Sequence, residues 1–265
     1  MQLTGCLGLP SVAERTASAD RLAAEVGWRR ELLSGGGLDL VAYLPLAPQP
    51  AARLTVYIEG DGLAWISASR PSLNPTPRTP LALQLALAQP TGNAAYLARP
   101  CQFIESRGEA CQQGYWTDGR FAEAVIAASD RAIDQLKQRF AASELQLVGY
   151  SGGGAVATLL AARRKDVTSL VTVAGNLDHR LWTQMQRLTP LQHSLNPADA
   201  RGALGGMRQW HLVGGRDRVV PAELAQHFIA GLPQPQLAHL QLLEAFDHHC
   251  CWVRDWPSLW PAFAE

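Results

Sequence analysis

The sequence predicts an α/β protein with a mainly parallel central sheet, helices on both faces and an antiparallel hairpin at the N-terminal end. Short apolar runs rich in β-branched residues alternate with segments of helical periodicity, which is typical of parallel sheets. Residues 28–33 and 38–44 alternate in polarity and are joined by Ser34-Gly35-Gly36-Gly37, which indicates the hairpin. With 265 residues, 47% of them hydrophobic, the chain is long enough to bury one full core.

The first half of the chain supplies the next elements. Residues 53–58 and 95–98 are expected to be strands, and the proline-rich stretch 63–94 a loop with one short helix at 81–88. A helix is expected from a cap at Thr117 or Asp118 to about Phe140. Its periodicity predicts a buried stripe made of Phe121, Val125, Ala128, Ala132 and Leu136.

The second half continues the alternation of strands and helices. Strands are expected at 145–148, 167–174, 210–213 and 240–243, and helices at 155–164, 221–230 and around Trp252, Trp256 and Trp260. Residues 28–265 are therefore expected to form a single domain. Residues 1–27 are expected to be an N-terminal tether, because a loose stretch of Gly, Pro and Ser follows Cys6.

One glycine-rich turn carries a candidate nucleophile. It reads Gly149-Tyr150-Ser151-Gly152-Gly153-Gly154 and lies between an apolar strand-like run and an alanine-rich run. In that setting a Gly-x-Ser-x-Gly turn predicts a nucleophile elbow, which presents the serine hydroxyl at the carboxyl edge of the sheet. The backbone N–H of Gly152 opens the helix and is expected to donate to a developing oxyanion. The alternative is an ordinary N-cap serine.

An aspartate follows a later predicted strand, in Gly214-Gly215-Arg216-Asp217. From that turn, its carboxylate is placed to accept the Nδ1–H of a histidine and to fix the imidazole tautomer. The alternative is that Asp217 caps the helix beginning near Pro221, and the local sequence fits that equally well.

Two adjacent histidines, His248 and His249, follow the last predicted strand. Successive side chains of an extended loop point in opposite directions, so only one of the two faces the serine. We expect His248 to be the base, with His249 as the alternative. The chain order Ser, Asp, His is that of α/β-hydrolases and differs from the orders of the chymotrypsin and subtilisin types.

On these three sites the chain resembles the α/β-hydrolase superfamily, from about Arg29 to the C-terminus. More narrowly, Val56-Tyr57-Ile58-Glu59-Gly60-Asp61-Gly62, Ala95-Tyr96-Leu97-Ala98-Arg99-Pro100-Cys101-Gln102 and His248-His249-Cys250-Cys251-Trp252 are similar to bacterial lipoprotein-type hydrolases. The resemblance implies the α/β-hydrolase fold and a serine hydrolase with a Ser151, His248 and Asp217 triad. Such an enzyme cleaves a carboxylic ester, thioester or amide through an acyl-enzyme.

The superfamily also has an oxyanion loop after the third strand, often written His-Gly. This chain has Glu59-Gly60-Asp61-Gly62 there. The donor that an oxyanion needs is a backbone N–H, so we expect Asp61 to supply the second one, with Gly62 next. The alternative is that Asp61 and Gly62 form a surface turn. A carboxylate beside the site disfavours anionic substrates unless it points away.

Several alternatives stay open on the same sequence. Asp178 and His179 follow the strand at 167–174 and are the alternative acid and base. A serine peptidase or an acyltransferase is the rival on the same fold, and a non-catalytic binding protein is the rival from another class. Trp65, Trp116 and Trp182 are candidates for the walls of an apolar pocket.

The composition of the chain limits the classes of molecule that it is expected to bind. Lys and Arg number 23 and Asp and Glu also 23, scattered along the chain, so the sequence has no basic patch for nucleic acid or acidic membranes. No Cys-x-x-Cys pair is present, and neither a metal nor a cofactor is expected. The expected partner is a small-molecule ester or acyl substrate.

The five cysteines give information about the cellular compartment of the protein. Leu3-Thr4-Gly5-Cys6 resembles the bacterial lipobox, whose cysteine becomes lipidated, and this predicts a membrane-anchored protein on the periplasmic side. The cytoplasm is the alternative, because only five residues precede Cys6. In an oxidising compartment Cys101 and Cys111 are expected to form a disulfide, whereas Cys250 and Cys251 need a vicinal bridge or separate partners.

Overall fold

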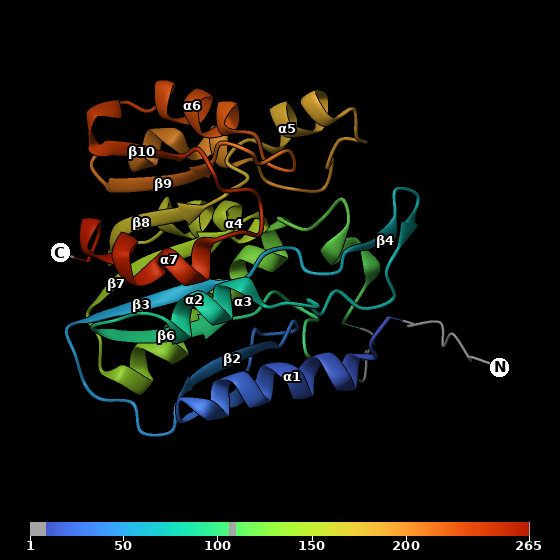
Figure 1. Ribbon diagram of the computed structural model, residues 1–265, viewed down its shortest axis with the longest axis vertical. Coiled ribbons are helices and arrows are strands. Elements are labelled where there is room, and N and C mark those ends of the chain that lie inside the picture. Colours follow the sequence, from blue (N-terminus) through green and yellow to red (C-terminus); the bar gives the residue numbers. More distant parts are fainter. Residues whose placement is uncertain (1–8, 106–109, 265) are drawn as a thin grey trace.

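A single eight-stranded sheet runs through the molecule, in the order β1-β2-β6-β3-β7-β8-β9-β10 (Figure 1). The computed structural model describes residues 9–105 and 110–264. The strands are β1 (Trp28–Leu33), β2 (Leu40–Pro45), β3 (Arg53–Ile58), β6 (Asn93–Leu97), β7 (Glu144–Tyr150), β8 (Val167–Val173), β9 (Arg208–Gly214) and β10 (Ala238–Leu243). β2 pairs antiparallel with β1 and β6, and the other neighbouring pairs are parallel. The mainly parallel sheet and its N-terminal hairpin are thus confirmed.

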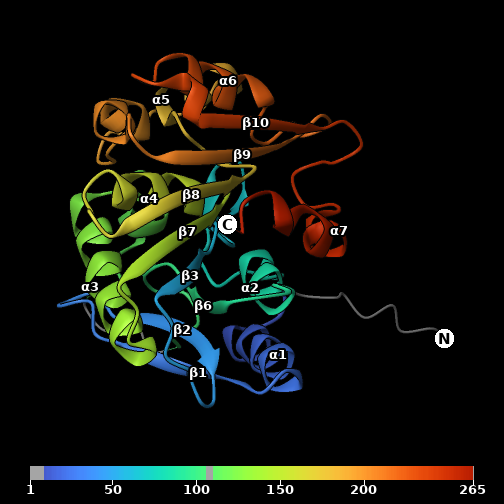
Figure 2. The ribbon, with the colours of Figure 1, turned by 90° about the vertical axis from the view of Figure 1, so that its left-hand side faces the viewer.

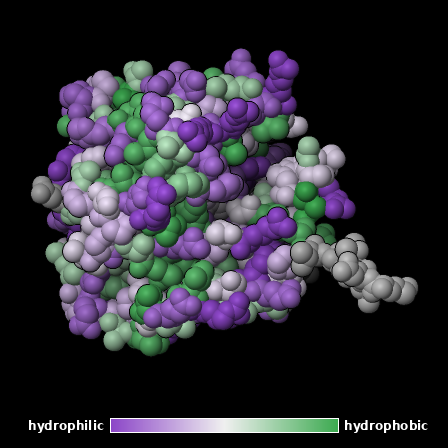
Figure 3. Space-filling model, viewed as in Figure 1, coloured by the Kyte–Doolittle hydropathy of each residue, from purple (hydrophilic) through white to green (hydrophobic). Residues whose placement is uncertain are grey.

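Helices cover both faces of this sheet (Figure 2). One face carries α3 (Glu123–Phe140), α4 (Gly152–Ala161) and α6 (Ala222–Ala230), and the other carries α1 (Val12–Glu25), α2 (Leu81–Leu87) and α7 (Trp252–Leu259). α5 (His179–Gln186) follows β8. Among the described residues no helix combines the length and apolarity that a membrane span requires. Hydrophilic and hydrophobic residues are interspersed over the face seen in Figure 3.

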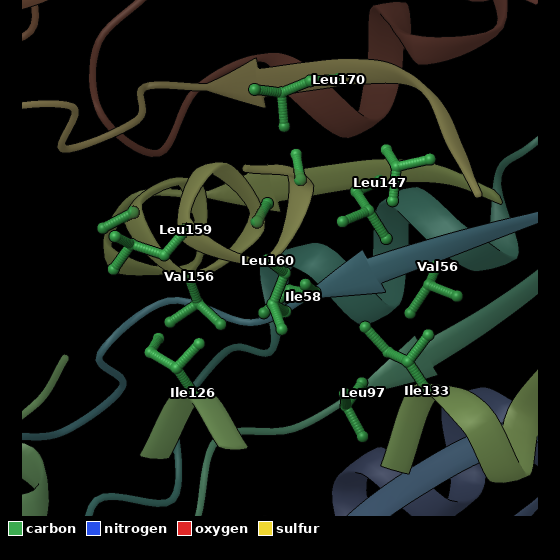
Figure 4. Close-up of a cluster of buried hydrophobic side chains, with 14 of the residues drawn as sticks. Val56, Ile58, Leu97, Ile126, Ile133, Leu147, Val156, Leu159, Leu160 and Leu170 are labelled. Carbon is green, nitrogen blue, oxygen red and sulfur yellow. The ribbon is translucent and has the colours of Figure 1, made fainter. Parts of the chain in front are cut away.

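The core follows from the alternation of side chains along the strands. Successive residues of a strand point to opposite faces, so Val56 and Ile58 pack toward α3 and α4, while Tyr57 packs toward α2 and α7. Figure 4 shows Val56 and Ile58 with Ile126 and Ile133 of α3 and further apolar side chains of β7 and α4. Because both faces are buried, the central strands are mainly apolar on both faces, as expected for parallel sheets. Buried polar residues interrupt them at a few positions, and the Thr55 hydroxyl of β3 donates to Gln146 Oε1 of β7 (3.2 Å).

The N-terminal region differs from the sequence expectation. The tether expected over residues 1–27 contains helix α1, which belongs to the folded body. Ser11 and Glu14 form a capping box, in which the Ser11 N–H donates to Glu14 Oε2 (2.7 Å) and the Glu14 N–H to Ser11 Oγ (3.2 Å). The buried face of α1 consists of Arg15 and the small residues Thr16, Ala19 and Ala23, so it lacks a large apolar stripe. Cys6 lies outside the described residues.

Two further elements also differ from expectation. α3 begins at Glu123 after Ala122, so neither Thr117 nor Asp118 caps it. The Thr117 hydroxyl instead donates to the Gln113 carbonyl in the preceding turn (3.0 Å). The predicted stripe of this helix region is fully buried. The loop after β3 also contains a short hairpin, β4 (Trp65–Ser67) and β5 (Arg70–Pro71), that the sequence did not reveal.

Candidate active site

Polar residues gather at the carboxyl edge of the parallel strands. Asp61 follows β3, Ser151 follows β7, Asp178 follows β8, Asp217 follows β9 and His248 follows β10. Loops at this edge of an open α/β sheet meet in space, which makes it the usual place for ligands. Side chains far apart in the sequence are therefore brought to one place by the topology of the sheet.

Ser151 lies in a sharp turn between β7 and α4. Its backbone has φ 52° and ψ −121°, a conformation that a non-glycine residue adopts only under constraint. A Cβ on Gly149 would lie 2.3 Å from the Gly153 carbonyl oxygen, and one on Gly153 would lie 2.2 Å from the Ile58 carbonyl oxygen. Both positions therefore require glycine, which explains the Gly-x-Ser-x-Gly pattern sterically.

The histidine and the aspartate expected from the sequence lie next to this serine. His248 Nε2 is 3.0 Å from Ser151 Oγ, and His248 Nδ1 is 2.8 Å from Asp217 Oδ2. The Asp217 side chain is fully buried, and only 6% of His248 is exposed. The three side chains thus form a continuous line of contacts from a buried carboxylate to a hydroxyl at the sheet edge.

His248 is held from its backbone as well. Its carbonyl oxygen accepts hydrogen bonds from the Tyr150 hydroxyl (3.1 Å) and the Trp252 Nε1–H (3.2 Å). The Tyr150 ring also packs against the His248 ring, with centroids 5.3 Å apart. Trp252 begins α7, so the last helix supports the loop that carries His248.

The neighbouring His249 contacts a different side chain, that of Tyr150. Its Nδ1 is 3.1 Å from the Tyr150 hydroxyl, and no contact with Ser151 is found for it in the described part of the chain. Burial lowers the pKa of His249 below its ordinary value, assisted by the charge of His248. His249 still borders the cavity beside Ser151.

Asp178 and His179, the alternative acid and base, are engaged elsewhere. Asp178 Oδ1 accepts the backbone N–H groups of Arg180 (3.1 Å) and Leu181 (3.2 Å), so Asp178 is the N-cap of α5. His179 Nε2 lies 3.3 Å from the Ser194 carbonyl oxygen, and its ring packs against Phe121. The structure does not bring either residue to Ser151.

Asp61 lies between two arginines that sequence reasoning missed. Its Oδ2 is 2.5 Å from Arg120 Nη1, and its Oδ1 is 3.3 Å from Arg99 Nη1. Burial alone would raise the pKa of Asp61, but the charges of Arg120 and Arg99 outweigh it and hold the pKa below its ordinary value. An anionic substrate was expected to require that the Asp61 carboxylate point away from the site. The carboxylate does not point away, but the two arginines balance its charge.

The Asp61 loop and the start of α4 flank the serine. A Cβ on Gly152 would lie 2.0 Å from Asp61 Oδ1, and one on Gly60 would lie 3.3 Å from Ser151 Cβ. Gly152 is the first residue of α4, where backbone N–H groups have no acceptor within the helix. The two backbone segments expected to supply oxyanion donors are therefore adjacent and next to Ser151.

A cavity of about 600 Å³ opens over Ser151 and His248. Its apolar wall includes Leu63, Trp65 and Trp182, and its charged wall includes Glu59, Asp61, Arg78 and Arg120. Burial raises the pKa of Glu59 to about 7, although the Gly60 N–H donates to its Oε1 (2.9 Å) and opposes the shift. Trp116 is not part of this wall; it is buried, and its Nε1–H donates to the Ser72 carbonyl (3.2 Å).

The cysteines with described positions form two disulfides. Cys101 is bonded to Cys111 with Cα atoms 5.6 Å apart, and Cys250 is bonded to Cys251. The second bridge lies between His249 and α7, in the loop that carries His248. Within residues 9–105 and 110–264, no group of three or more His, Cys, Asp or Glu side chains is arranged to hold a metal ion.

The strand order, the serine turn and the position of the site define the α/β-hydrolase fold. Many solved structures share it, and three serve as examples. They are the Est1E protein of Butyrivibrio proteoclasticus with ferulic acid bound (TM-score 0.64, 13% identity, 88% of this chain and 97% of that chain), the esterase Pf2001 of Pyrococcus furiosus (0.61, 13%, 97% and 94%) and an alpha-beta serine hydrolase homologue from Coxiella burnetii (0.60, 13%, 88% and 94%). No family model and no curated protein matches the sequence.

Proposed function

We propose that this protein is a carboxylic ester hydrolase in which Ser151 is the nucleophile, His248 the general base and Asp217 the residue that orients the base. The observation that carries the proposal is the line of contacts from Asp217 through His248 to Ser151, at 2.8 and 3.0 Å. These are hydrogen-bond distances, as proton transfer between the groups requires. The similarity in fold to Est1E and Pf2001 supports a hydrolase.

In the proposed reaction, Ser151 Oγ attacks the ester carbonyl carbon while its proton passes to His248 Nε2. Asp217 accepts the Nδ1–H of His248 and stabilises the imidazolium. The carbonyl oxygen becomes an oxyanion, to which the backbone N–H groups of Gly152 and Asp61 donate. When the C–O bond to the leaving group breaks, His248 returns the proton to the departing alkoxide and an acyl-Ser151 ester remains.

The second half of the reaction repeats these roles with water. His248 takes a proton from water, and the resulting hydroxide oxygen attacks the acyl carbon. The bond to Ser151 Oγ then breaks, the proton returns to Ser151, and a carboxylic acid leaves. An ester suits this site because an alkoxide needs less protonation to depart than an amine. If an alcohol takes the acyl group faster than water does, the protein is an acyltransferase.

The test combines active-site labelling with turnover. A fluorophosphonate probe should label the wild type, Ser151→Ala should prevent labelling, and Ser194→Ala is the control because Ser194 lies outside the proposed triad. A panel of 4-nitrophenyl esters of rising chain length then measures hydrolysis. Undiminished labelling of Ser151→Ala, or no labelling and no turnover by the folded wild type, would contradict the proposal. Product analysis with added alcohol distinguishes hydrolysis from acyl transfer.

A further inference from the structure

The cluster of Asp61, Arg99 and Arg120 places an excess of positive charge against the cavity. One carboxylate lies between two guanidinium groups, and all three side chains are largely or wholly inaccessible, with 4% of Arg99 and 8% of Arg120 side-chain surface exposed. Asp61 balances one of the two cations. The charge of Glu59 acts on Arg99 and balances the second in part, since burial raises the pKa of Glu59 to about 7. A buried charge that is only partly balanced is unfavourable, so the arrangement favours an additional anion.

Arg120 is the member of the cluster that borders the cavity. Its Nε donates to the Thr117 carbonyl (2.6 Å) and its Nη1 to Asp61 (2.5 Å). No acceptor for its Nη2 is found among the residues the structure describes. The Trp182 ring lies 5.9 Å from the guanidinium carbon and forms part of the same cavity wall. These contacts hold the guanidinium at the cavity wall, and they leave its Nη2 free to donate to a ligand.

The other charged groups of the wall do not cancel this charge. Arg78 adds a second cation at the exposed rim. Glu59 is the second carboxylate that faces the cavity, and burial raises its pKa to about 7, so near neutral pH it is ionised only in part. Asp217 lies behind His248 and is not part of the wall. Three arginines at or next to the cavity, Arg78, Arg99 and Arg120, therefore outnumber the two carboxylates of Glu59 and Asp61, and the surroundings of the cavity carry a net positive charge.

We propose that Arg120 is a specificity-determining residue that binds a carboxylate on the substrate, so that the preferred substrates are esters with an additional carboxylate group. This inference rests on the proposed esterase function. Arginine suits the role because its rigid, always charged guanidinium donates to carboxylates in a fixed geometry. Arg78 strengthens the attraction at the rim. This proposal runs against the expectation from sequence that Asp61 disfavours anionic substrates, because the two arginines offset the charge of Asp61.

A matched pair of substrates tests this. The 4-nitrophenyl ester of butyric acid and the mono-4-nitrophenyl ester of succinic acid have the same acyl chain length and leaving group, and differ in a terminal carboxylate. The wild type should show the higher kcat/KM for the succinate ester. Arg120→Gln should lower that kcat/KM by about 10- to 100-fold, mainly through KM, as expected for loss of a charge-assisted hydrogen bond made throughout the reaction.

Three comparisons separate recognition from support of the fold. Arg120→Gln should lower kcat/KM for the succinate ester by a clearly larger factor than kcat/KM for the butyrate ester, and Arg120→Lys should restore part of the preference for the succinate ester because it keeps the charge. Arg139→Gln is the control, since Arg139 is exposed and pairs with Glu31 away from the cavity. An equal loss on both esters, or no preference in the wild type, would overturn the assignment of Arg120.

The wild type provides a measurement that does not depend on folding of a variant. Succinate should inhibit turnover of the butyrate ester more strongly than the neutral succinamide does, and equal inhibition would contradict the proposal. Failure of the two proposals can be distinguished. Hydrolysis of both esters without preference removes only the role of Arg120, whereas absence of turnover together with absence of Ser151 labelling removes the esterase function itself.

Discussion

Asp217 contacts His248 with one carboxylate oxygen and holds its own turn with the other. Oδ2 lies 2.8 Å from His248 Nδ1, while Oδ1 accepts the backbone N–H groups of Val219 and Val220, both at 2.8 Å. The two interpretations that the sequence left open, orienting a histidine and capping the turn before α6, therefore apply to different atoms of one side chain. This arrangement fixes the carboxylate in both position and direction.

Asp217→Asn should separate the two contacts. The asparagine oxygen can still accept the backbone N–H groups, whereas its amide would face His248 and favour the wrong imidazole tautomer. We expect turnover to fall by up to about 10⁴-fold with little change in thermal stability. Steady-state kinetics and thermal unfolding measure the two effects, with Asp255→Asn on the exposed Arg254 pair as control. A loss of stability with unchanged turnover would mean that Asp217 acts only as a cap.

His248→Ala and His249→Ala should differ sharply. His248 contacts Ser151, so His248→Ala should lower turnover as much as Ser151→Ala does, by at least about 10³-fold. The double variant Ser151→Ala/His248→Ala should be little worse than either single variant. His249→Ala should retain most activity, because His249 contacts the Tyr150 hydroxyl instead. Steady-state kinetics on one ester compares all four variants. The opposite order would move the base to His249, and high activity in both histidine variants would contradict the triad.

Glu59 should make stability depend on pH. Burial raises its pKa from 4.5 to about 7 in the folded protein, so between about pH 4.5 and 7 the unfolded chain releases a proton that the folded protein retains. The stability associated with protonated Glu59 is therefore full below pH 4.5 and lost as pH rises toward 7. Glu59→Gln cannot ionise, so its unfolding free energy relative to wild type should increase by about 3 kcal/mol across this range.

Urea unfolding at pH 4.5, 6 and 7.5 measures this difference. Glu25→Gln, on the exposed end of α1, is the matched control, and its difference from wild type should stay constant. A constant difference for Glu59→Gln as well would show that this carboxyl titrates normally in the folded protein.

Expression with the sequence encoded upstream should place the protein at a membrane through lipid on Cys6. The two disulfides of the described region favour an oxidising compartment, which is consistent with export. Mass spectrometry of the mature N-terminus and fractionation of membranes test the prediction, with Cys6→Ser as control. An unmodified N-terminus in the cytoplasmic fraction, with Cys101 and Cys111 reduced, would contradict it.

The site residues that could be predicted from sequence depend on neighbours close in the chain, whereas the site residues that were missed depend on residues far away in the chain. Gly149 and Gly153 are required by steric contacts within a few residues of Ser151 or with the adjacent strand, so the turn is visible in a short motif. Asp217 and His248 follow strands in a recognisable order. Arg99 and Arg120 have no such signal, because they meet Asp61 from 38 and 59 residues away in the sequence.

Secondary structure could likewise be predicted only where the local sequence carries a clear pattern. The stripe of α3 is large and apolar, and its residues could be predicted, whereas α1 buries mainly small side chains and has no comparable pattern. The start of α3 was placed too early because Thr117 and Asp118 are good capping residues by type. In the folded chain they bond to Gln113 and His193 instead, and nothing in the local sequence indicates those partners.

The proposed triad and much of the cavity wall come from different parts of the chain. Ser151, Asp217 and His248 follow β7, β9 and β10, whereas Trp65 belongs to the short β4–β5 hairpin and Trp182 to α5. Trp65 is 40% exposed, and among the described residues no hydrogen bond joins residues 65–71 to Ser151, Asp217 or His248. We therefore expect that this hairpin can be exchanged or lengthened without disturbing the contact between His248 and Ser151. Within the proposed function, grafting different hairpins while the triad residues stay constant is accordingly a direct route to redesigned acyl selectivity.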